Sequence, residues 1–499
     1  MPKTIQEIND KIRKGQAVIV TAKEMKDIVS ERGPEKAAKE VDVVTTGTFG
    51  AMCSSGAFLN FGHADPPIKM QKVWLNDVEA YTGLAAVDAY IGATELSISK
   101  GMEYGGGHVI EDLIAGKEVQ VKATAYGTDC YPTKYIETAI TLEDINQAIM
   151  FNPRNAYQRY NAATNTTDRT LYTYMGTLLP NMKNINYAGT GEISPLNNDP
   201  TYKTIGVGTR IFLGGTQGYV ASEGTQHNPK SGFGNLAVTG NLKRMSLEYI
   251  RGAVIPKYGT SLFVGIGIPI PILNEEIAKA TAVRNSGLKT GIFDYGVPRL
   301  QRPLIREVTY EELMSGEVEV KGVKVKTAPL SSQTISVKIT KALKKWIEAK
   351  EFYLTEPADR LPQESVFKPM KMKSKTPPVS EVMSRPVITI GSKGNLAEVS
   401  NLLVEHSIDQ VPVVDDEERL LGIITSWDIT KATAEGKFDI ESIMTTNVIH
   451  SKPNESLEEV SRKLEKYSIN ATPVIDEQGK VVGIITLTDI NKVYRRMQR

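Results

Sequence analysis

The chain has 499 residues, with 59 Lys and Arg against 58 Asp and Glu and only two cysteines. A net charge of +1 excludes a chain-wide binder of nucleic acid or of an anionic membrane, because both need a basic excess. Two cysteines exclude a disulfide framework, and the length predicts roughly two to four domains.

No targeting or membrane segment is evident. Residues 1–14 lack the apolar core of a signal peptide. The longest apolar stretch, residues 261–273, is too short to span a bilayer and contains Pro269 and Pro271. We therefore expect a cytoplasmic protein that binds neither membrane nor nucleic acid and whose two cysteines are free thiols.

The N-terminal residues alternate helical and strand patterns. In order they predict a helix that begins after Thr4, a strand, a helix broken near Gly33-Pro34 and a second strand, the last three over residues 17–21, 23–39 and 41–46. A polar, glycine-rich loop follows and ends at Cys53. This order indicates an α/β fold, in which ligands bind beyond the carboxyl ends of strands.

Cys53 therefore lies where chemistry is expected, within Gly50-Ala51-Met52-Cys53-Ser54-Ser55-Gly56. Its small neighbours equally fit a buried structural thiol, since free cysteine is among the most buried residue types. Asn60, His63 and Asp65 form a polar cluster soon afterwards, and His63 is a candidate for binding substrate.

Cys130 lies in a polar stretch, Gly127-Thr128-Asp129-Cys130-Tyr131-Pro132-Thr133-Lys134. Pro132 is expected to begin a helical turn whose N–H groups point toward Cys130, and Lys134 adds positive charge. Both effects favour the reactive thiolate, whereas Asp129 opposes it unless it is engaged in capping. Cys130 is accordingly the candidate reactive thiol.

Glycine-rich loops recur through the rest of this region. They are Gly105-Gly106-Gly107-His108, Ala188-Gly189-Thr190-Gly191-Glu192, Gly206-Val207-Gly208-Thr209-Arg210 and Gly214-Gly215-Thr216-Gln217-Gly218. None completes a dinucleotide-binding or P-loop motif. They form either tight turns or, for at least two of them, the lining of a pocket for a small anionic substrate.

Two residues of these loops are candidates for binding that substrate. Arg210 could clamp a carboxylate with two hydrogen bonds, or be an ordinary surface arginine. His108 could face the substrate from its loop. No HExxH motif or paired histidine spacing occurs, so no metal site is expected.

Residues 357–377 are rich in proline and lysine and have no periodicity, which predicts a linker after a first domain of residues 1–356. The remainder is a tandem repeat, predicted as units over residues 378–435 and 436–499. Gly422 to Asp428 recurs as Gly483 to Asp489, and 489 − 428 gives an offset of 61. Each unit predicts a β-α-β-β-α order.

The repeated unit resembles the CBS domain, and the two together resemble a tandem CBS module. This resemblance implies a cleft for an adenosine-containing ligand such as AMP, ATP or S-adenosylmethionine. It implies four binding residues, Thr425, Asp428, Thr486 and Asp489. An Asp in this position can instead simply cap its helix. CBS pairs commonly associate face to face, so we expect a homodimer.

The first domain resembles the homocysteine biosynthesis family, L-aspartate semialdehyde sulfurtransferases of anaerobic prokaryotes. The matching stretches are residues 45–56, 127–132 and 206–215. The resemblance implies that sulfide and aspartate semialdehyde become homocysteine, with a persulfide on Cys130. It also implies a companion electron donor with ferredoxin-like iron–sulfur and NIL domains. The fold expected overall is a large α/β catalytic domain rich in glycine loops, followed by the CBS module.

Electron counting supports an external donor. Converting R–CHO to R–CH2–SH needs two electrons when the sulfur is sulfide and four when it is sulfane sulfur on Cys130. The chain has neither cluster ligands nor a nicotinamide fingerprint, so we expect no tightly bound cofactor. The persulfide sulfur would attack the aldehyde, with His63 or His108 as general acid. Cys53 would resolve the linkage as a disulfide with Cys130 or only shape the pocket.

Two other functions remain open from the sequence. CBS pairs also occur in nucleotide dehydrogenases that use a loop cysteine, but there the pair is inserted in a barrel, and here it is terminal without an eightfold strand–helix rhythm. Alternatively, the protein is a non-catalytic nucleotide-sensing binding protein in which both cysteines are structural.

Overall fold

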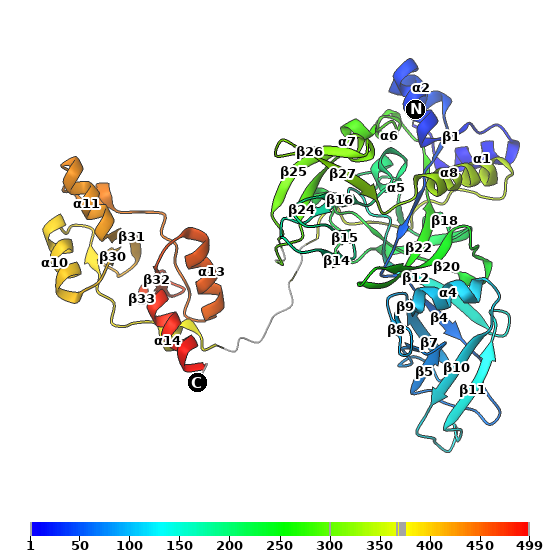
Figure 1. The fold of residues 1–499 in the computed structure, drawn as a ribbon. Helices are drawn as coiled ribbons and strands as arrows, with labels where there is room; N and C mark the ends of the chain where they lie inside the picture. The colour runs from blue at the N-terminus through cyan, green and yellow to red at the C-terminus, as the bar shows by residue number, and fades with distance from the viewer. Residues whose placement is uncertain (1, 299–300, 366–367, 369–375, 498–499) are drawn as a thin grey trace. The chain divides into compact units, whose positions relative to one another are not determined.

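The computed structural model describes residues 2–298, 301–365, 368 and 376–497. The chain divides into two compact units, Met1–Phe367 and Lys368–Arg499 (Figure 1). Unit 1 holds both cysteines, and unit 2 holds the tandem repeat. The predicted mixed α/β class is confirmed.

Unit 1 is built mainly on three sheets. The central sheet has the order β21 (Ile250–Ile255), β22 (Gly259–Gly267), β18 (Arg210–Leu213), β19 (Thr216–Glu223), β20 (Leu236–Asn241), β12 (Gln147–Asn155), β4 (Gly56–Asn60), β7 (Asp88–Gly92), with β3 (Thr48–Ala51) beside β22. The arm sheet has the order β11 (Tyr135–Ile140), β10 (Val119–Thr124), β5 (Lys72–Leu75), β6 (Val78–Ala80), β8 (Leu96–Ser97), β9 (Gly101–Gly105). The lateral sheet has the order β25 (Leu304–Thr309), β24 (Lys289–Asp294), β13 (Ala162–Thr164), β16 (Asn184–Tyr187), β27 (Val323–Pro329), β26 (Glu317–Val320).

Smaller pairings and helices complete the unit. The short strands are β1 (Ile19–Thr21), β2 (Val43–Thr45) and β23 (Pro269–Pro271) in one sheet, β14 (Leu171–Thr173) with β15 (Gly176–Leu178), and β17 (Gly206–Val207) with β28 (Asp359–Arg360). The helices are α1 (Ile5–Lys14), α2 (Ala22–Arg32), α3 (Pro34–Glu40), α4 (Gly106–Ile114), α5 (Pro195–Asn198), α6 (Glu275–Ala280), α7 (Tyr310–Met314) and α8 (Gln333–Glu348).

The N-terminal elements follow their sequence signals. Thr4 caps α1 through a capping box with Glu7, and the break between α2 and α3 falls at Gly33-Pro34. The strands β1 and β2 run parallel, as the strand–helix–strand order predicts. The central sheet is not the parallel sheet that a continued strand–helix–strand order would give. The strand pairs along it are antiparallel, and neighbouring strands are joined largely without crossover helices.

Helix α8 anchors one edge of unit 1 through a single apolar stripe. Ile339, Leu343 and Ile347 recur every four residues, are fully buried, and pack with Ile8 of α1 and Phe352. Full burial of each such side chain contributes about 1.5–3 kcal/mol relative to exposure. This cluster fixes α1 and α8 against β3, the strand that leads to Cys53.

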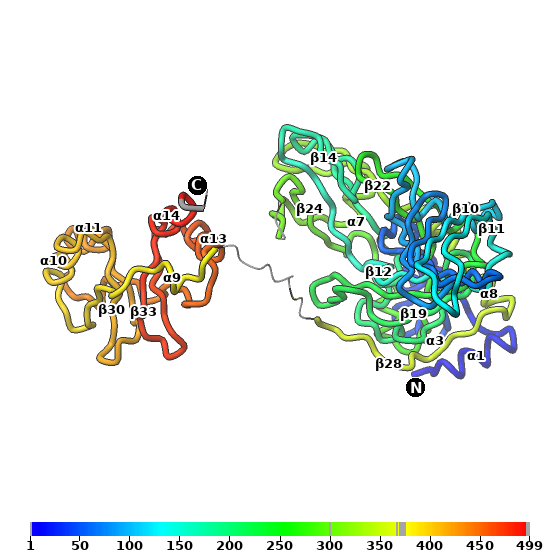
Figure 2. The backbone as a smooth tube through the Cα atoms, turned by 90° about the horizontal axis from the view of Figure 1, so that it is seen from below, coloured from blue at the N-terminus to red at the C-terminus, as the bar shows by residue number. Residues whose placement is uncertain are grey.

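The first part of the expected linker is attached to unit 1. Strand β28 pairs with β17, Leu361 is buried, and the Nε2 of His227 contacts the Pro362 carbonyl at 3.0 Å. Figure 2 shows the chain leaving α8 and running past β28 along unit 1. These backbone contacts hold residues 357–365 on the unit, whereas most of the remaining expected linker lies outside the described residues.

The first repeat of unit 2 has the predicted β-α-β-β-α order, whereas in the second repeat the first strand is reduced to an isolated bridge between Ser451 and Val474. The elements of unit 2 are α9 (Val379–Val382), β29 (Ile390–Gly391), α10 (Leu396–His406), β30 (Gln410–Val414), β31 (Leu420–Thr425), α11 (Ser426–Glu435), α12 (Ile440–Ile443), α13 (Leu457–Tyr467), β32 (Ala471–Ile475), β33 (Val481–Thr486) and α14 (Leu487–Met497). Each repeat packs against a segment that precedes the other: Val379 and Met383 join the core of the second repeat, and Met444 packs on the first.

Candidate active site

A cavity of about 300 Å³ opens between the central and lateral sheets of unit 1. That volume is at the lower end of the range of ligand pockets and suits a small metabolite. The lining comes from segments distant in sequence: Thr48, Gly50, Ala51, Met52, Cys53, Ser54, Arg154, Tyr157, Tyr160, Tyr174, Met175, Ala188, Gly189, Tyr258, Leu330 and Ser331.

Cys53 lies in this lining, in the turn between β3 and β4. Its side chain is half-buried, and the Ser261 hydroxyl on β22 donates to its sulfur at 3.2 Å. Burial raises the pKa of the Cys53 thiol, and the Ser261 hydrogen bond opposes that rise only in part. Cys53 is therefore a protonated thiol at neutral pH that faces a cavity.

Asn152 ties the Cys53 turn to β12. Its fully buried amide donates to the Ser55 hydroxyl at 2.9 Å, while its carbonyl accepts from the Ser54 hydroxyl at 2.8 Å and from the Arg154 backbone N–H at 2.9 Å. The pairing register of β12 with β20 shifts between Asn152 and Asn155, and Arg154 lies in this irregular stretch. Bulges of this kind change the direction in which a side chain points and are frequent beside active sites. Arg154, which lies in this bulge, lines the cavity.

Tyrosines form a large part of the wall. Tyr157 and Tyr160 follow β12, Tyr174 comes from the β14–β15 turn, and Tyr258 comes from the β21–β22 turn. Burial raises the pKa of Tyr157, Tyr160 and Tyr258. These phenols therefore remain protonated hydrogen-bond donors at neutral pH.

The opposite wall lies at the ends of two parallel strands. Gly189 follows β16 and Ser331 follows β27, and these strands are paired in parallel. The Gly189 N–H donates to the Ser331 hydroxyl at 2.9 Å, and Gly189 has φ of 100°, which favours glycine. The rule that ligands bind beyond the carboxyl ends of parallel strands thus describes this wall.

Cys130 lies elsewhere, in the loop between β10 and β11 of the arm sheet. Its side chain is exposed and its sulfur is 3.6 Å from the Thr128 hydroxyl. The prediction of a helical turn at Pro132 is wrong. The backbones of Thr128 and Tyr131 hydrogen-bond to each other, and the chain then continues into β11 without a helix. The prediction failed because Thr133, directly after Pro132, pairs with Ile68 in a parallel β-bridge, which holds this part of the loop extended.

The two thiols are at opposite ends of β4. Cys53 precedes Gly56, whereas Asn60 ends the strand toward His63, whose ring stacks on Tyr131 beside Cys130. The four residue steps of β4 alone span about 13 Å at roughly 3.3 Å each. A disulfide needs Cα atoms within about 7 Å, so the thiols are not within reach of each other in this structure.

The other predicted binding residues lie outside the Cys53 cavity. His63 is exposed and borders a second, mostly apolar cavity of about 170 Å³ in the arm. His108 caps α4, where its Nδ1 accepts from the Gly105 N–H at 3.2 Å and burial lowers its pKa. The Arg210 guanidinium lies over the rings of Tyr219 and Phe352.

Of the four glycine-rich loops, only the one with Ala188-Gly189 lines the Cys53 cavity among the residues described. The remaining wall was not predicted. A usable signal exists in Asn152-Pro153-Arg154, because proline inside a strand pattern marks a bulge or an edge. The dense polar and aromatic run that follows, as far as Tyr160, is a second signal.

The CBS candidates form the caps of two helices. In each repeat the Asp carboxylate accepts from the Thr hydroxyl, at 2.7 Å for Asp428 with Thr425 and 2.8 Å for Asp489 with Thr486. The capping interpretation is thus what the structure shows. These hydrogen bonds use one oxygen, Oδ2, of each carboxylate.

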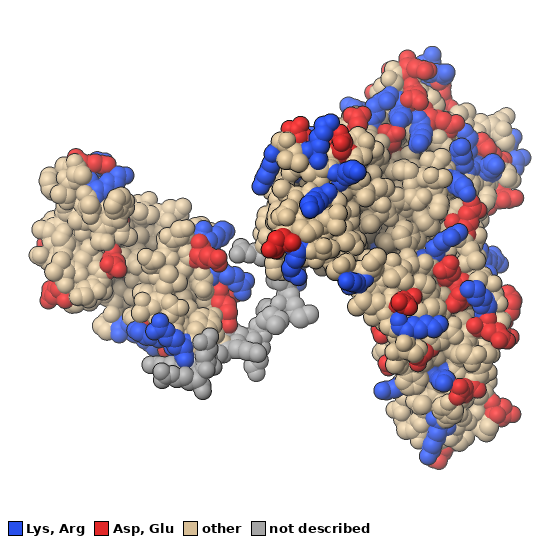
Figure 3. Space-filling view, viewed as in Figure 1, with Lys and Arg blue, Asp and Glu red and all other residues tan. Residues whose placement is uncertain are grey.

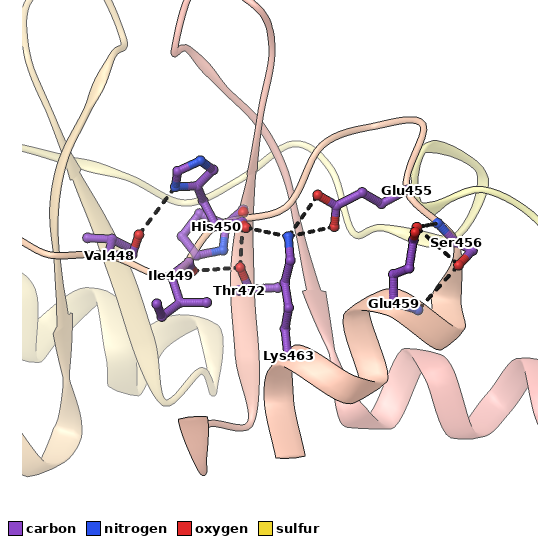
Figure 4. Close-up of polar contacts among 9 residues, drawn as sticks. Val448, Ile449, His450, Glu455, Ser456, Glu459, Lys463 and Thr472 are labelled. Atoms are coloured by element: carbon purple, nitrogen blue, oxygen red, sulfur yellow. Dashed lines mark hydrogen bonds and ion pairs between the residues drawn. The ribbon is translucent and has the colours of Figure 1, made fainter. Parts of the chain in front are cut away.

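The second repeat also has a polar frame around the segment before α13. Lys463 donates to the His450 carbonyl at 2.9 Å and pairs with Glu455 at 2.7 Å, and Thr472 donates to the Ile449 carbonyl at 2.7 Å (Figure 4). Ser456 and Glu459 cap α13. The frame fixes residues 449–456 beside β32.

The surface charge, the possible metal ligands and the possible membrane spans can each be read from the described residues. On the face drawn in Figure 3, basic and acidic side chains are interspersed. Across the described stretches of chain, no three His, Cys, Asp or Glu side chains converge as a set of metal ligands. No helix in those stretches has the length and apolarity needed to cross a bilayer.

Comparison with known proteins gives two family matches. Residues 17–354 match the family described as homocysteine biosynthesis enzyme, sulfur-incorporation, and residues 379–435 and 440–496 each match the CBS domain. A protein named L-aspartate semialdehyde sulfurtransferase from Methanosarcina acetivorans is 52% identical over 495 residues, 99% of each chain. One of the same name from Methanocaldococcus jannaschii is 52% identical over 507 residues, again 99% of each.

A solved CBS domain pair, in complex with 5′-methylthioadenosine and S-adenosyl-L-methionine, is 41% identical. It covers 24% of this chain and 98% of its own, with a TM-score of 0.24.

Proposed function

The chain belongs to the homocysteine biosynthesis enzymes that incorporate sulfur, and we propose that it converts the aldehyde of L-aspartate semialdehyde into the thiol of homocysteine. The substrate has an aldehyde at one end and an amino-acid group at the other, and it is small enough for the Cys53 cavity. The observation that carries the proposal is a thiol facing a tyrosine-lined pocket of metabolite size.

Cys130 is the proposed sulfur carrier. Its exposure lets a large sulfur donor or a reductant reach the sulfur directly, which Cys53 at the wall of a cavity does not allow. A donor of sulfane sulfur loads Cys130 as a persulfide without a net redox change. Loading from sulfide itself requires an oxidant that accepts two electrons.

The terminal persulfide sulfur attacks the aldehyde carbon held in the Cys53 cavity. The adduct is R–CH(OH)–S–S–Cys, and four electrons with four protons convert it to R–CH2–SH, Cys–SH and water. Because the thiols are apart in this structure, turnover requires the β10–β11 loop to approach the cavity, in its own copy or in a second copy of the expected homodimer.

The departing oxygen needs a proton donor. No histidine is in the described lining, so His63 and His108 are poorly placed for that role. The phenols of Tyr157, Tyr160 and Tyr258 are protonated at neutral pH and line the same cavity. We assign the proton transfer to this group of tyrosines.

The electrons come from outside the chain in this proposal. Within the described residues no cluster of metal ligands is present. An iron–sulfur protein with ferredoxin-like and NIL domains is the expected donor, and the exposed arm loop is where it would reach the disulfide-linked adduct.

The test is synthesis of homocysteine by the purified chain from aspartate semialdehyde, a sulfur donor and a low-potential chemical reductant. Reductant-dependent homocysteine supports the proposal, and its absence with an intact, folded chain contradicts it. Incubation with IMP and NAD tests the dehydrogenase alternative: formation of reduced nicotinamide would favour that enzyme class instead.

The CBS pair is the proposed regulatory part, binding an adenosine-containing ligand with Thr425, Asp428, Thr486 and Asp489. Support comes from the matched CBS signatures and from the capping geometry of Asp428, whose hydrogen bonds among the described residues use only Oδ2. Calorimetry with AMP, ATP and S-adenosylmethionine tests it. Lack of binding by all three below millimolar concentration would leave the pair with a structural role.

A further inference from the structure

One charged side chain distinguishes the Cys53 cavity. Arg154 is the only Lys, Arg, Asp or Glu in the described lining. None of the ion pairs found among the described residues includes it, and it is half-buried. A half-buried cation without an acidic partner, facing a cavity, is suited to an anionic ligand.

The framework around Arg154 holds its guanidinium in one orientation. The Asn152 carbonyl fixes its backbone N–H at 2.9 Å, and its Nε donates to the Thr225 hydroxyl at 2.8 Å. With Nε engaged, the two terminal nitrogens form the remaining fork. The Tyr157 phenol lies near the same guanidinium, whose positive charge opposes the rise in the Tyr157 pKa that burial causes. A planar carboxylate matches this fork with two parallel hydrogen bonds.

The remaining wall suits an ammonium group. No carboxylate is present in the described lining, and the Tyr160 and Tyr174 rings border the cavity. Tyrosine ring faces attract an ammonium group within about 6 Å, with a contribution of about 0.5–2 kcal/mol that depends on desolvation. The wall thus offers a carboxylate site and an aromatic site side by side.

We propose that Arg154 binds the α-carboxylate of an α-amino-acid substrate while the tyrosines enclose its ammonium group, so that the far end of the side chain reaches Cys53. This inference rests on the proposed function and names the recognition element of the same site. It also assigns to Arg154 the role that the sequence suggested for Arg210.

The test uses Arg154→Gln and Arg154→Lys, with Arg159→Gln as the matched control. Arg159 belongs to the same segment but is absent from the cavity lining. We expect Arg154→Gln to raise the KM for aspartate semialdehyde about 10- to 100-fold, with partial recovery in Arg154→Lys because the charge returns without the fork. Arg159→Gln should stay within about twofold.

A second readout does not depend on turnover. L-homoserine, which keeps the amino-acid group but lacks the aldehyde, should slow alkylation of Cys53 in the wild type and in Arg159→Gln but not in Arg154→Gln. 3-Amino-1-propanol, which lacks the carboxylate, should protect none of them. Equal protection of wild type and Arg154→Gln by homoserine would overturn the inference while homocysteine synthesis still supports the function. A wild type that makes no homocysteine and is not protected by homoserine would overturn both.

Discussion

Cys53 and Cys130 occupy opposite chemical environments within one unit. Cys53 is half-buried at the wall of a cavity, receives a hydrogen bond from Ser261, and has a raised pKa. Cys130 is exposed in an arm loop, with the Thr128 hydroxyl 3.6 Å away. In the proposed reaction this difference separates two tasks: exchange of sulfur with large external partners needs access, whereas reaction at an aldehyde benefits from exclusion of water.

The largest expected effect comes from removing either thiol. Cys130→Ser should lower sulfur-donor-dependent homocysteine synthesis by more than about 100-fold, because the carried sulfur atom has no other attachment site. Cys53→Ser should also lower synthesis, yet leave persulfide loading of Cys130 unchanged. Product and persulfide are quantified separately by mass spectrometry. Full homocysteine synthesis by Cys130→Ser would contradict the proposal that Cys130 carries the sulfur.

Alkylation rates give the next largest contrast. We expect iodoacetamide to modify Cys130 about 10- to 100-fold faster than Cys53 at pH 7.5, because Cys130 is exposed and Cys53 is a protonated, half-buried thiol. Since burial raises the pKa of Cys53 above its usual range, its thiolate fraction at pH 7–9 is small and grows about tenfold per pH unit. Its rate should therefore still be rising steeply at pH 9. Peptide mapping after timed quenching measures both rates. Equal alkylation rates at the two cysteines, levelling off at the same pH, would contradict the difference between their environments.

A smaller effect is expected at the hydrogen bond to Cys53. Ser261→Ala removes the donor that lowers the pKa of this thiol, so the pKa should rise further and alkylation of Cys53 should slow about 3- to 10-fold at fixed pH. Ser54→Ala, whose hydroxyl bonds to Asn152 rather than to the sulfur, is the matched control. Cys130 should react at its wild-type rate in both variants. A faster Cys53 in Ser261→Ala would contradict the assigned hydrogen bond.

Local signals account for what the sequence predicted well. Thr4 with Glu7 and the Gly33-Pro34 break determine the first helices, and the 61-residue repeat determines the order of unit 2. These features depend on neighbouring residues or on a repeated unit, so pattern and spacing reveal them.

Non-local pairing accounts for what the sequence could not predict. The cavity joins Cys53, Arg154, Gly189 and Ser331, which meet only because β4 pairs with β12 and β16 pairs with β27. No periodicity carries that information. Arg210 has the same chemistry as Arg154, but its strand directs it toward Tyr219 and Phe352 instead.

The division of roles between Cys130 and Cys53 is tested most directly by locating the added sulfur after treatment of the intact chain with polysulfide, a source of sulfane sulfur. Thiol-blocked peptides are mapped by mass spectrometry. We predict a gain of one sulfur atom on the peptide that holds Cys130 and none on the peptide that holds Cys53. Sulfur on Cys53 alone, with Cys130 unmodified, would contradict it.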